Sequence, residues 1–224
     1  MSAKIIYVSG DKGGVGKTMT SIGIADHLIR AQIPCRMIET DTGNPDAALI
    51  MNDEISCEAI DTTQEAPWHD LLRICEESKD ESVVINAGAR DNVAIKSWGK
   101  DYLEAIAQAT GKELLTLWVV AASDEKDGLI ALREYLSMLK NRTYAVECEA
   151  KGKLQMYADS KARGEVEASG GTLLTFPALS SICALKLKTV RLSPAKIVDN
   201  GNVLEKIATA KWRGRIDEFM VNVK

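Results

Sequence analysis

The feature that most constrains the fold is a glycine-rich turn between an apolar run and an amphipathic segment near the start of the chain. The apolar run KIIYVS, residues 4–9, leads into SGDKGGVGKT, residues 9–18, and a segment with helical period follows. Glycine backbones reach conformations that other residues resist, so successive N–H groups of such a turn can converge on an anion at a helix N-terminus. A strand, a glycine-rich loop and a helix in this order predict a phosphate-binding loop.

Short apolar runs alternate with longer segments of helical period along the rest of the chain. We expect strands over residues 34–40, 81–88, 114–123, 143–148 and 170–177, and helices over 19–31, 67–79, 92–110 and 124–141, with two more helical stretches after them. This alternation is typical of a parallel sheet covered by helices on both faces. The predicted fold class is therefore α/β, a P-loop NTPase with a mostly parallel twisted sheet, and residues 1–224 are expected to form a single nucleotide-binding domain.

Within the loop, each residue type suits a phosphate ligand. Glycine frees the backbone, the Lys17 ammonium would bridge phosphate oxygens, and the Thr18 hydroxyl would ligate Mg²⁺. The residues expected to contact the nucleotide are Asp11, Lys12, Gly13, Gly14, Val15, Gly16, Lys17, Thr18 and Met19. The general pattern G-x-x-x-x-G-K-S/T is not met in full, because Asp11 stands at its first glycine.

The segment KGGVGKT, residues 12–18, resembles the deviant Walker A motif of the ParA/MinD family of partition and positioning ATPases. The resemblance implies ATP or ADP with Mg²⁺ as cofactors, and a homodimer that forms on ATP. Lys12 matches the signature lysine of the family, which reaches across the dimer to the partner's nucleotide, so a catalytic role is expected for Lys12. The short chain, without an N-terminal helix-turn-helix extension, is similar to the short plasmid-type members, such as StbB-like and TraL-like proteins. No match to the family's adenine-reading asparagine occurs in VECEAKG, residues 146–152, so adenine is implied by the resemblance alone.

Two later segments carry the side chains that would surround the phosphates. Where the family usually has a D-x-D pair, this chain has Glu39 and Asp41, and Asp41 resembles the residue that orients the attacking water or contacts the Mg²⁺ shell. An acidic loop in contact with solvent is the alternative interpretation of this pair. In the second switch, Asn86 stands at the expected aspartate and Gly88 at the turn. An amide brings no negative charge, so we expect weak Mg²⁺ binding and weak ATP hydrolysis unless Asp91 or Asp41 compensates.

The formal charge of −4 hides an uneven distribution along the chain. Residues 184–224 contain nine Lys and Arg against four Asp and Glu, which makes the C-terminal helices basic from about residue 184. The resemblance implies DNA binding without sequence preference through basic residues of this region, namely Lys186, Lys188, Arg191, Lys211, Arg213 and Arg215. The alternative is a final helix that docks on the core through one stripe, with its lysines in solvent; the stripe is Leu204, Ala208, Trp212, Ile216, Phe219 and Val223.

Localisation is expected to be cytoplasmic, and associated with the nucleoid if the protein binds DNA. The chain begins with a short apolar strand instead of a charged leader and an apolar core, and it has no run of 18 apolar residues. Five widely spaced cysteines without a C-x-x-C pair are typical of a protein kept reduced. A basic amphipathic C-terminus could also lie on a membrane, as in MinD-like proteins, but Glu205, Asp217 and Glu218 on its polar face would be repelled by anionic lipid.

These features predict an ATP-dependent, dimerising switch ATPase in plasmid or DNA partition, stability or conjugation-linked positioning. Its partners would be a second copy, DNA and a centromere-binding or relaxosome-type adaptor protein. A nucleotide-binding scaffold that hydrolyses ATP very slowly or not at all, and regulates a partner protein, is the alternative that Asn86 favours. A metabolic P-loop enzyme of the dethiobiotin synthetase type is a third, for which we find no substrate-site marker. A nitrogenase iron-protein relative would need a cluster-ligating cysteine, and none occurs between Asn86 and Cys148.

Overall fold

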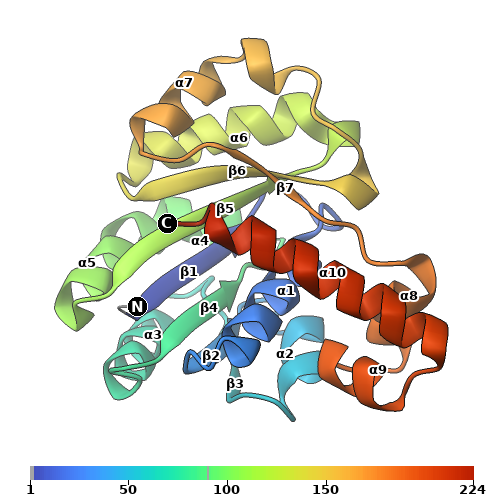
Figure 1. Ribbon diagram of the computed structural model, residues 1–224. Helices are drawn as coiled ribbons and strands as arrows, with labels where there is room; N and C mark the ends of the chain where they lie inside the picture. The colour runs from blue at the N-terminus through green and yellow to red at the C-terminus, as the bar shows by residue number, and fades with distance from the viewer. Residues whose placement is uncertain (1–2, 90) are drawn as a thin grey trace.

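A single twisted sheet forms the centre of the computed structural model, which describes residues 3–89 and 91–224 (Figure 1). Within these ranges seven strands lie in the order β3-β2-β4-β1-β5-β6-β7, and all neighbouring strands run parallel. The strands are β1 Lys4–Ser9, β2 Cys35–Glu39, β3 Cys57–Ala59, β4 Ser82–Asn86, β5 Glu113–Val120, β6 Arg142–Cys148 and β7 Leu173–Phe176. The predicted α/β class is confirmed, and β1 lies in the middle of the sheet with the glycine-rich loop at its carboxyl end.

Helices cover both faces of this sheet, and each face has its own apolar cluster (Figure 1). The helices are α1 Lys17–Arg30, α2 Asp46–Met51, α3 Ala66–Glu77, α4 Asp91–Ala94, α5 Lys100–Thr110, α6 Glu125–Met138, α7 Lys161–Ala168, α8 Ser181–Thr189, α9 Pro194–Asn200 and α10 Val203–Val221, with a π-helical turn at Ile95–Gly99. Successive residues of β1 point to opposite faces. Ile5 and Tyr7 therefore join the cluster under α3, α5, α6 and α7, whereas Ile6 and Val8 join the cluster under α1, α2, α8, α9 and α10.

Three features of the fold differ from the sequence prediction. α2 and β3 were not predicted, because six- and three-residue elements are too short to show a period. The helix expected over residues 92–110 is interrupted by the π-helical turn, which ends at Gly99; a Cβ there would lie 2.5 Å from Cδ1 of Ile95. Three helices, not two, follow β7 in the described chain.

The stripe predicted for the final helix is correct over its second half and wrong at Leu204. Trp212, Ile216 and Phe219 are buried, but Leu204 is 77% exposed. The inward position of the first turn of α10 belongs instead to Glu205, whose carboxylate accepts a hydrogen bond from the N–H of Asn202 at 2.9 Å in a capping box. The cap therefore turns Leu204 toward solvent.

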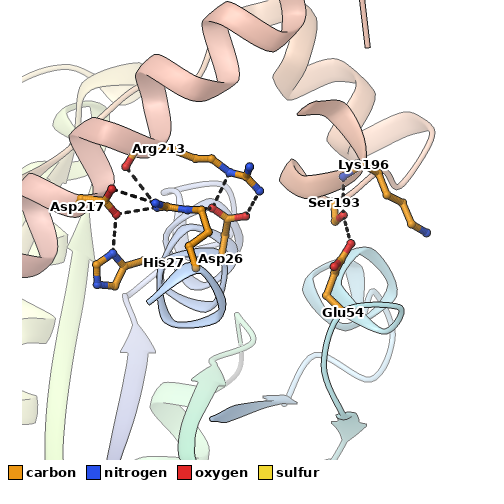
Figure 2. A network of polar contacts seen from close by, with 8 residues as sticks. Asp26, His27, Glu54, Ser193, Lys196, Arg213 and Asp217 are labelled. Carbon is orange, nitrogen blue, oxygen red and sulfur yellow. Dashed lines mark hydrogen bonds and ion pairs between the residues drawn. The ribbon is translucent and has the colours of Figure 1, made fainter. Parts of the chain in front are cut away.

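A polar network joins α10 to α1 (Figure 2). Asp26, 3% exposed, accepts hydrogen bonds from Nε of Arg213 at 2.9 Å and from Nε of Arg30 at 3.0 Å. Asp217 accepts from Arg30 at 2.7 Å and lies 2.6 Å from Nδ1 of His27. The helix that begins at the glycine-rich loop is therefore held at its other end by the C-terminal helix. None of the helices over the described ranges is long and apolar enough to cross a membrane.

Candidate functional site

The glycine-rich loop lies between β1 and α1 at the carboxyl edge of the sheet, as predicted. Gly14 and Gly16 have φ angles of 78° and 123°, in the left-handed region that favours glycine. At Gly16, an added Cβ would also lie 2.5 Å from Sγ of Cys148, the last residue of β6. The loop therefore rests directly on the sheet, and position 16 needs glycine for both conformation and space.

A cavity of about 400 Å³ opens beside this loop. Six of the nine residues predicted to contact the nucleotide line it, namely Gly13, Gly14, Gly16, Lys17, Thr18 and Met19. The other three predicted residues do not line the cavity. Val15 is buried in the core, and Asp11 accepts a hydrogen bond from Nδ2 of Asn92 at 2.9 Å. The Lys12 side chain contacts Asp124 instead. The opposite wall includes Lys151 and the inner side of α8, which sequence reasoning did not connect with the loop.

Lys17 lines the cavity and is buried, with 7% of its surface exposed. Its Nζ donates a hydrogen bond to the carbonyl oxygen of Lys12 at 2.8 Å. Burial lowers the pKa of Lys17, and the neighbouring carboxylates of Asp91 and Asp41 act in the opposite direction. The Lys17 ammonium can therefore give up its hydrogen bond to the Lys12 carbonyl and donate to a phosphate oxygen in the cavity instead.

Lys12 is held by carboxylates of its own chain. Its Nζ lies 3.0 Å from Oδ1 of Asp124 and 3.1 Å from Oδ2 of Asp127, at the start of α6. The hydrogen bonds to Asp124 and Asp127 raise the pKa of Lys12, and the same contact lowers the pKa of Asp124. The sequence analysis missed both partners, although Asp124 follows the carboxyl end of β5 and so belongs to the edge of the sheet that carries the loop.

Glu39 and Asn86, which stand where the ParA/MinD pattern has aspartates, contact each other. Glu39 is fully buried, and Nδ2 of Asn86 donates to its two carboxylate oxygens at 2.9 and 2.8 Å. Oδ1 of Asn86 in turn accepts from the hydroxyl of Ser21 at 2.9 Å. Burial raises the pKa of Glu39 to about 7, against the opposing effect of the Asn86 hydrogen bonds. An aspartate at position 86 would instead place a second carboxylate against the first.

Asp41 and Asp91 are the two carboxylates that could compensate for the missing negative charge at Asn86. Of these two, Asp41 lines the cavity beside the loop. Asp41 also lines a second cavity of about 410 Å³ next to Gly88. Asp91 is buried and accepts from the hydroxyls of Tyr7 at 2.9 Å and Thr40 at 2.7 Å, and burial raises its pKa. Thr40 also accepts from the N–H of Gly88 at 2.8 Å, so Asp91 supports the turn at Gly88 through Thr40.

The cavity beside the loop contains the kinds of oxygen donor that Mg²⁺ prefers. The Thr18 hydroxyl and the Asp41 carboxylate both line it. No group of three or more His, Cys, Asp and Glu side chains arranged for a metal ion occurs in the described part of the chain.

The six basic residues predicted to bind DNA do not form one free surface. Four of them pair with carboxylates of the same chain, as Arg213–Asp26, Arg215–Glu149, Lys186–Glu205 and Arg191–Asp46. The hydrogen bonds from Arg215 lower the pKa of Glu149 to about 2. Lys188 and Lys211 have no ion pair within residues 3–89 and 91–224. Lys188 also lines the cavity beside the loop, whereas Lys211 is exposed. DNA contact stays a prediction.

Comparison with known proteins places this site in a known fold. No family model matches the chain. It is 28% identical over 227 residues to Protein MobD of Acidithiobacillus ferrooxidans, across 100% of this chain and 99% of the relative. The MinD cell division protein of Aquifex aeolicus has a similar structure, with a TM-score of 0.55, 14% identity, and coverage of 96% of this chain and 97% of that one. MinD in the MinC:MinD complex of the same organism gives a TM-score of 0.56 at 14% identity, with 96% of both chains covered.

A longer protein shares the same fold over part of its length. The Signal Recognition Particle 54 kDa protein from Aeropyrum pernix K1 gives a TM-score of 0.55 at 13% identity, with 97% of this chain covered. This chain spans 50% of the length of that protein. The parallel sheet, the glycine-rich loop at its centre and these likenesses together show that the chain has the α/β fold of the P-loop NTPases.

Proposed function

We propose that the chain is an ATP-dependent, dimerising switch ATPase of ParA/MinD type, acting in plasmid or DNA partition, stability or conjugation-linked positioning. The observation that carries this proposal is one cavity lined both by the buried Lys17 and by the loop with Gly14 and Gly16 at positive φ. Loop N–H groups, the ammonium and the N-terminus of α1 would together bind the phosphates of ATP or ADP. The likeness to MinD and the GDP complex of the 54 kDa protein support nucleotide binding in this fold.

The residues that would act on the nucleotide follow from the cavity. Thr18 and Asp41 would hold Mg²⁺, which supplies charge neutralisation at the phosphates when bound. Asp41 would also orient the attacking water. Lys12 would have to leave Asp124 and Asp127 to reach the nucleotide of a second copy, so the phosphate charge must compete with two carboxylates for this lysine. The MinC:MinD complex supports partner proteins for such a dimer; DNA and a centromere-binding or relaxosome-type adaptor are the partners we propose here.

Measuring molecular mass by sedimentation, without nucleotide and with ADP or ATP, tests this proposal. We expect a dimer with ATP only. Lys17→Ala should weaken nucleotide binding by about 100-fold, because it removes a buried charge from the phosphate site. Lys12→Ala should keep nucleotide binding and remain monomeric.

The double variant Asp124→Asn, Asp127→Asn should dimerise at about three- to tenfold lower protein concentration than the wild type, since Lys12 is then free. Asp70→Asn, which removes a surface carboxylate on α3, is the matched control; normal dimerisation of Lys12→Ala would contradict the proposal.

A nucleotide-binding scaffold with little or no hydrolysis is the second candidate, and the contacts of Asn86 favour it. Both functional groups of this amide already have partners, Glu39 and Ser21, and the amide brings no charge toward a metal. Phosphate release with Mg²⁺, in the presence and absence of DNA, separates the two functions. Turnover that is lost in Lys12→Ala supports the ATPase, whereas nucleotide binding without turnover under any of these conditions supports the scaffold.

A further inference from the structure

The helix α8 lies at the surface and is held to the fold by few buried side chains. Of its nine residues, Cys183 and Leu187 alone are buried. Its other large apolar side chains, Ile182 and Leu185, are 63% and 60% exposed. A helix that buries so little apolar surface has low local stability, so it can open while the rest of the chain stays folded.

The inner side of α8 borders the cavity beside the glycine-rich loop. Ala184, Leu187 and Lys188 line this cavity, together with residues of α1, α2 and the loop itself. Lys188 has no ion pair in the part of the chain that the structure describes, so its ammonium is free to meet a negative charge in the cavity. A phosphate-bearing ligand that fills the cavity would therefore contact α8 on its charged side.

Three polar contacts fix the corner that follows α8 to α2 and to the turn after α2. The guanidinium of Arg191 lies 3.7 Å from Oδ1 of Asp46, which also lines the cavity. The hydroxyl of Ser193 donates to the Glu54 carboxylate at 2.5 Å, as Figure 2 shows. The third contact is the Lys196–Asp53 ion pair. We call these three contacts the latch; its central serine is fully buried, so that hydrogen bond to a charged group is shielded from water.

The backbone of the corner is strained at Arg191. Its φ angle is 55°, and within residues 3–89 and 91–224 Gln32 is the one other non-glycine residue at positive φ. A helix that ends with a left-handed residue usually has Gly or Asn there, because a Cβ disfavours this conformation. Strain of this kind persists where surrounding contacts hold it, and the latch supplies such contacts on both sides of the bend.

We propose that α8 is a lid on the cavity and that the latch holds this lid closed, so that release of the latch admits and releases the nucleotide. The lid rests on the proposed function, since it assumes that the cavity binds nucleotide. Lys186 keeps α8 attached to α10 through Glu205, at 2.7 Å, while the end of α8 moves away from α2. Lys188 adds a contact to the phosphates when the lid is closed.

Stopped-flow fluorescence with methylanthraniloyl-ADP and the full chain tests the lid. The double variant Asp53→Ala, Glu54→Ala removes two partners of the latch, and neither residue lines the cavity. We expect its association and dissociation rates both to rise by about tenfold, because the lid opens more often, with the dissociation constant changed by less than about threefold. Lys188→Ala should raise the dissociation rate alone, since it removes a ligand contact and leaves the latch intact. Glu76→Ala with Glu77→Ala, which removes two exposed carboxylates from α3, is the matched control and should keep both rates.

Hydrogen exchange of the nucleotide-free chain tests the latch without relying on nucleotide binding. Amides of residues 181–190 should exchange about tenfold faster in the latch variant than in the wild type, while those of residues 66–77 on α3 stay unchanged. Arg191→Gly should also speed exchange of α8, and it should not lower the overall stability because it relieves the strained φ.

Two results would overturn the proposal. Exchange of α8 that the latch variant leaves unchanged, or that rises equally on α3, would mean that these contacts do not hold α8 in particular. Nucleotide rates equal to those of the wild type, with faster exchange of α8, would mean that α8 is no lid. Failure of the wild type to bind methylanthraniloyl-ADP would contradict the proposed function and the role of the lid toward nucleotide, whereas the exchange experiment would still decide whether the latch holds α8.

Discussion

Asn86→Asp is expected to lower the free energy of unfolding by about 3 kcal/mol near pH 8, and by much less near pH 5. The present amide donates to both oxygens of Glu39, at 2.9 and 2.8 Å, inside the core. A carboxylate at position 86 would take away these donors and bring a like charge into direct contact with a fully buried group. The two acids would then share one proton, and removing it would be costly.

The pH dependence has a definite sign. Burial already raises the pKa of Glu39 to about 7, above its ordinary value of about 4.3 in an unfolded chain. Folded protein therefore binds this proton more tightly than unfolded protein, so the stability contributed by the protonated acid is complete below about pH 4.3 and is lost as the pH rises through about 7. A second carboxylate at position 86 would push the last ionisation to higher pH, so the loss of stability in the variant should grow between pH 5 and pH 8.

Urea unfolding of the wild type and variants at the two pH values measures this effect. The control is the double variant Glu39→Gln, Asn86→Asp, which exchanges the amide and the carboxylate between β2 and β4 and restores a donor–acceptor pair. It should recover most of the lost stability near pH 8. Because it places a carboxylate where the ParA/MinD pattern has its second-switch aspartate, it should also hydrolyse ATP faster than the wild type if the proposed ATPase is correct. An equal loss of stability at both pH values would mean that the lost Nδ2 hydrogen bonds to Glu39, and not repulsion between two carboxylates, cause the effect.

Asp26→Ala is expected to destabilise the fold by about 3 kcal/mol or more, because it leaves the guanidinium groups of Arg30 and Arg213 without their shared buried carboxylate. Arg213 is the more affected of the two, since its side chain is only 14% exposed and Arg30 keeps Asp217. The loss should be visible in thermal and urea unfolding as a single shift of the whole transition, because the network joins α1 to α10.

Two further variants identify the cause. Adding Arg213→Met to Asp26→Ala removes the unpaired charge while it keeps much of the side-chain volume, and it should restore part of the stability. Asp70→Ala, which removes a 64% exposed partner of Arg73, should cost less than about 0.5 kcal/mol. If Asp26→Ala and Asp70→Ala had similar effects, the buried network between α1 and α10 would not contribute as proposed.

Local features of the chain were sufficient to predict the loop and most of the elements. Six of the nine predicted loop residues line the cavity, because a strand, a glycine-rich turn and a helix follow one another directly over residues 4–30 and carry their own geometry. Asp41 also lines the cavity, since the carboxyl ends of parallel strands meet at one edge, and its roles toward Mg²⁺ and the attacking water stay predictions. The role of Lys12 could be predicted only by resemblance, and its two carboxylate partners were missed.

Local patterns along the chain are therefore enough to predict the α/β alternation, the central glycine-rich loop, and the unusual residues Glu39 and Asn86. The folded chain is needed to show that Glu39 pairs with Asn86 across 47 residues, that Lys12 meets Asp124 across 112 residues, and that Arg213 meets Asp26 across 187 residues. Hydrophobic periodicity and sequence motifs indicate which face of its own helix or strand a side chain occupies. The partner that it meets depends on strand order, on helix packing and on caps such as the one that turns Glu205 inward and Leu204 outward.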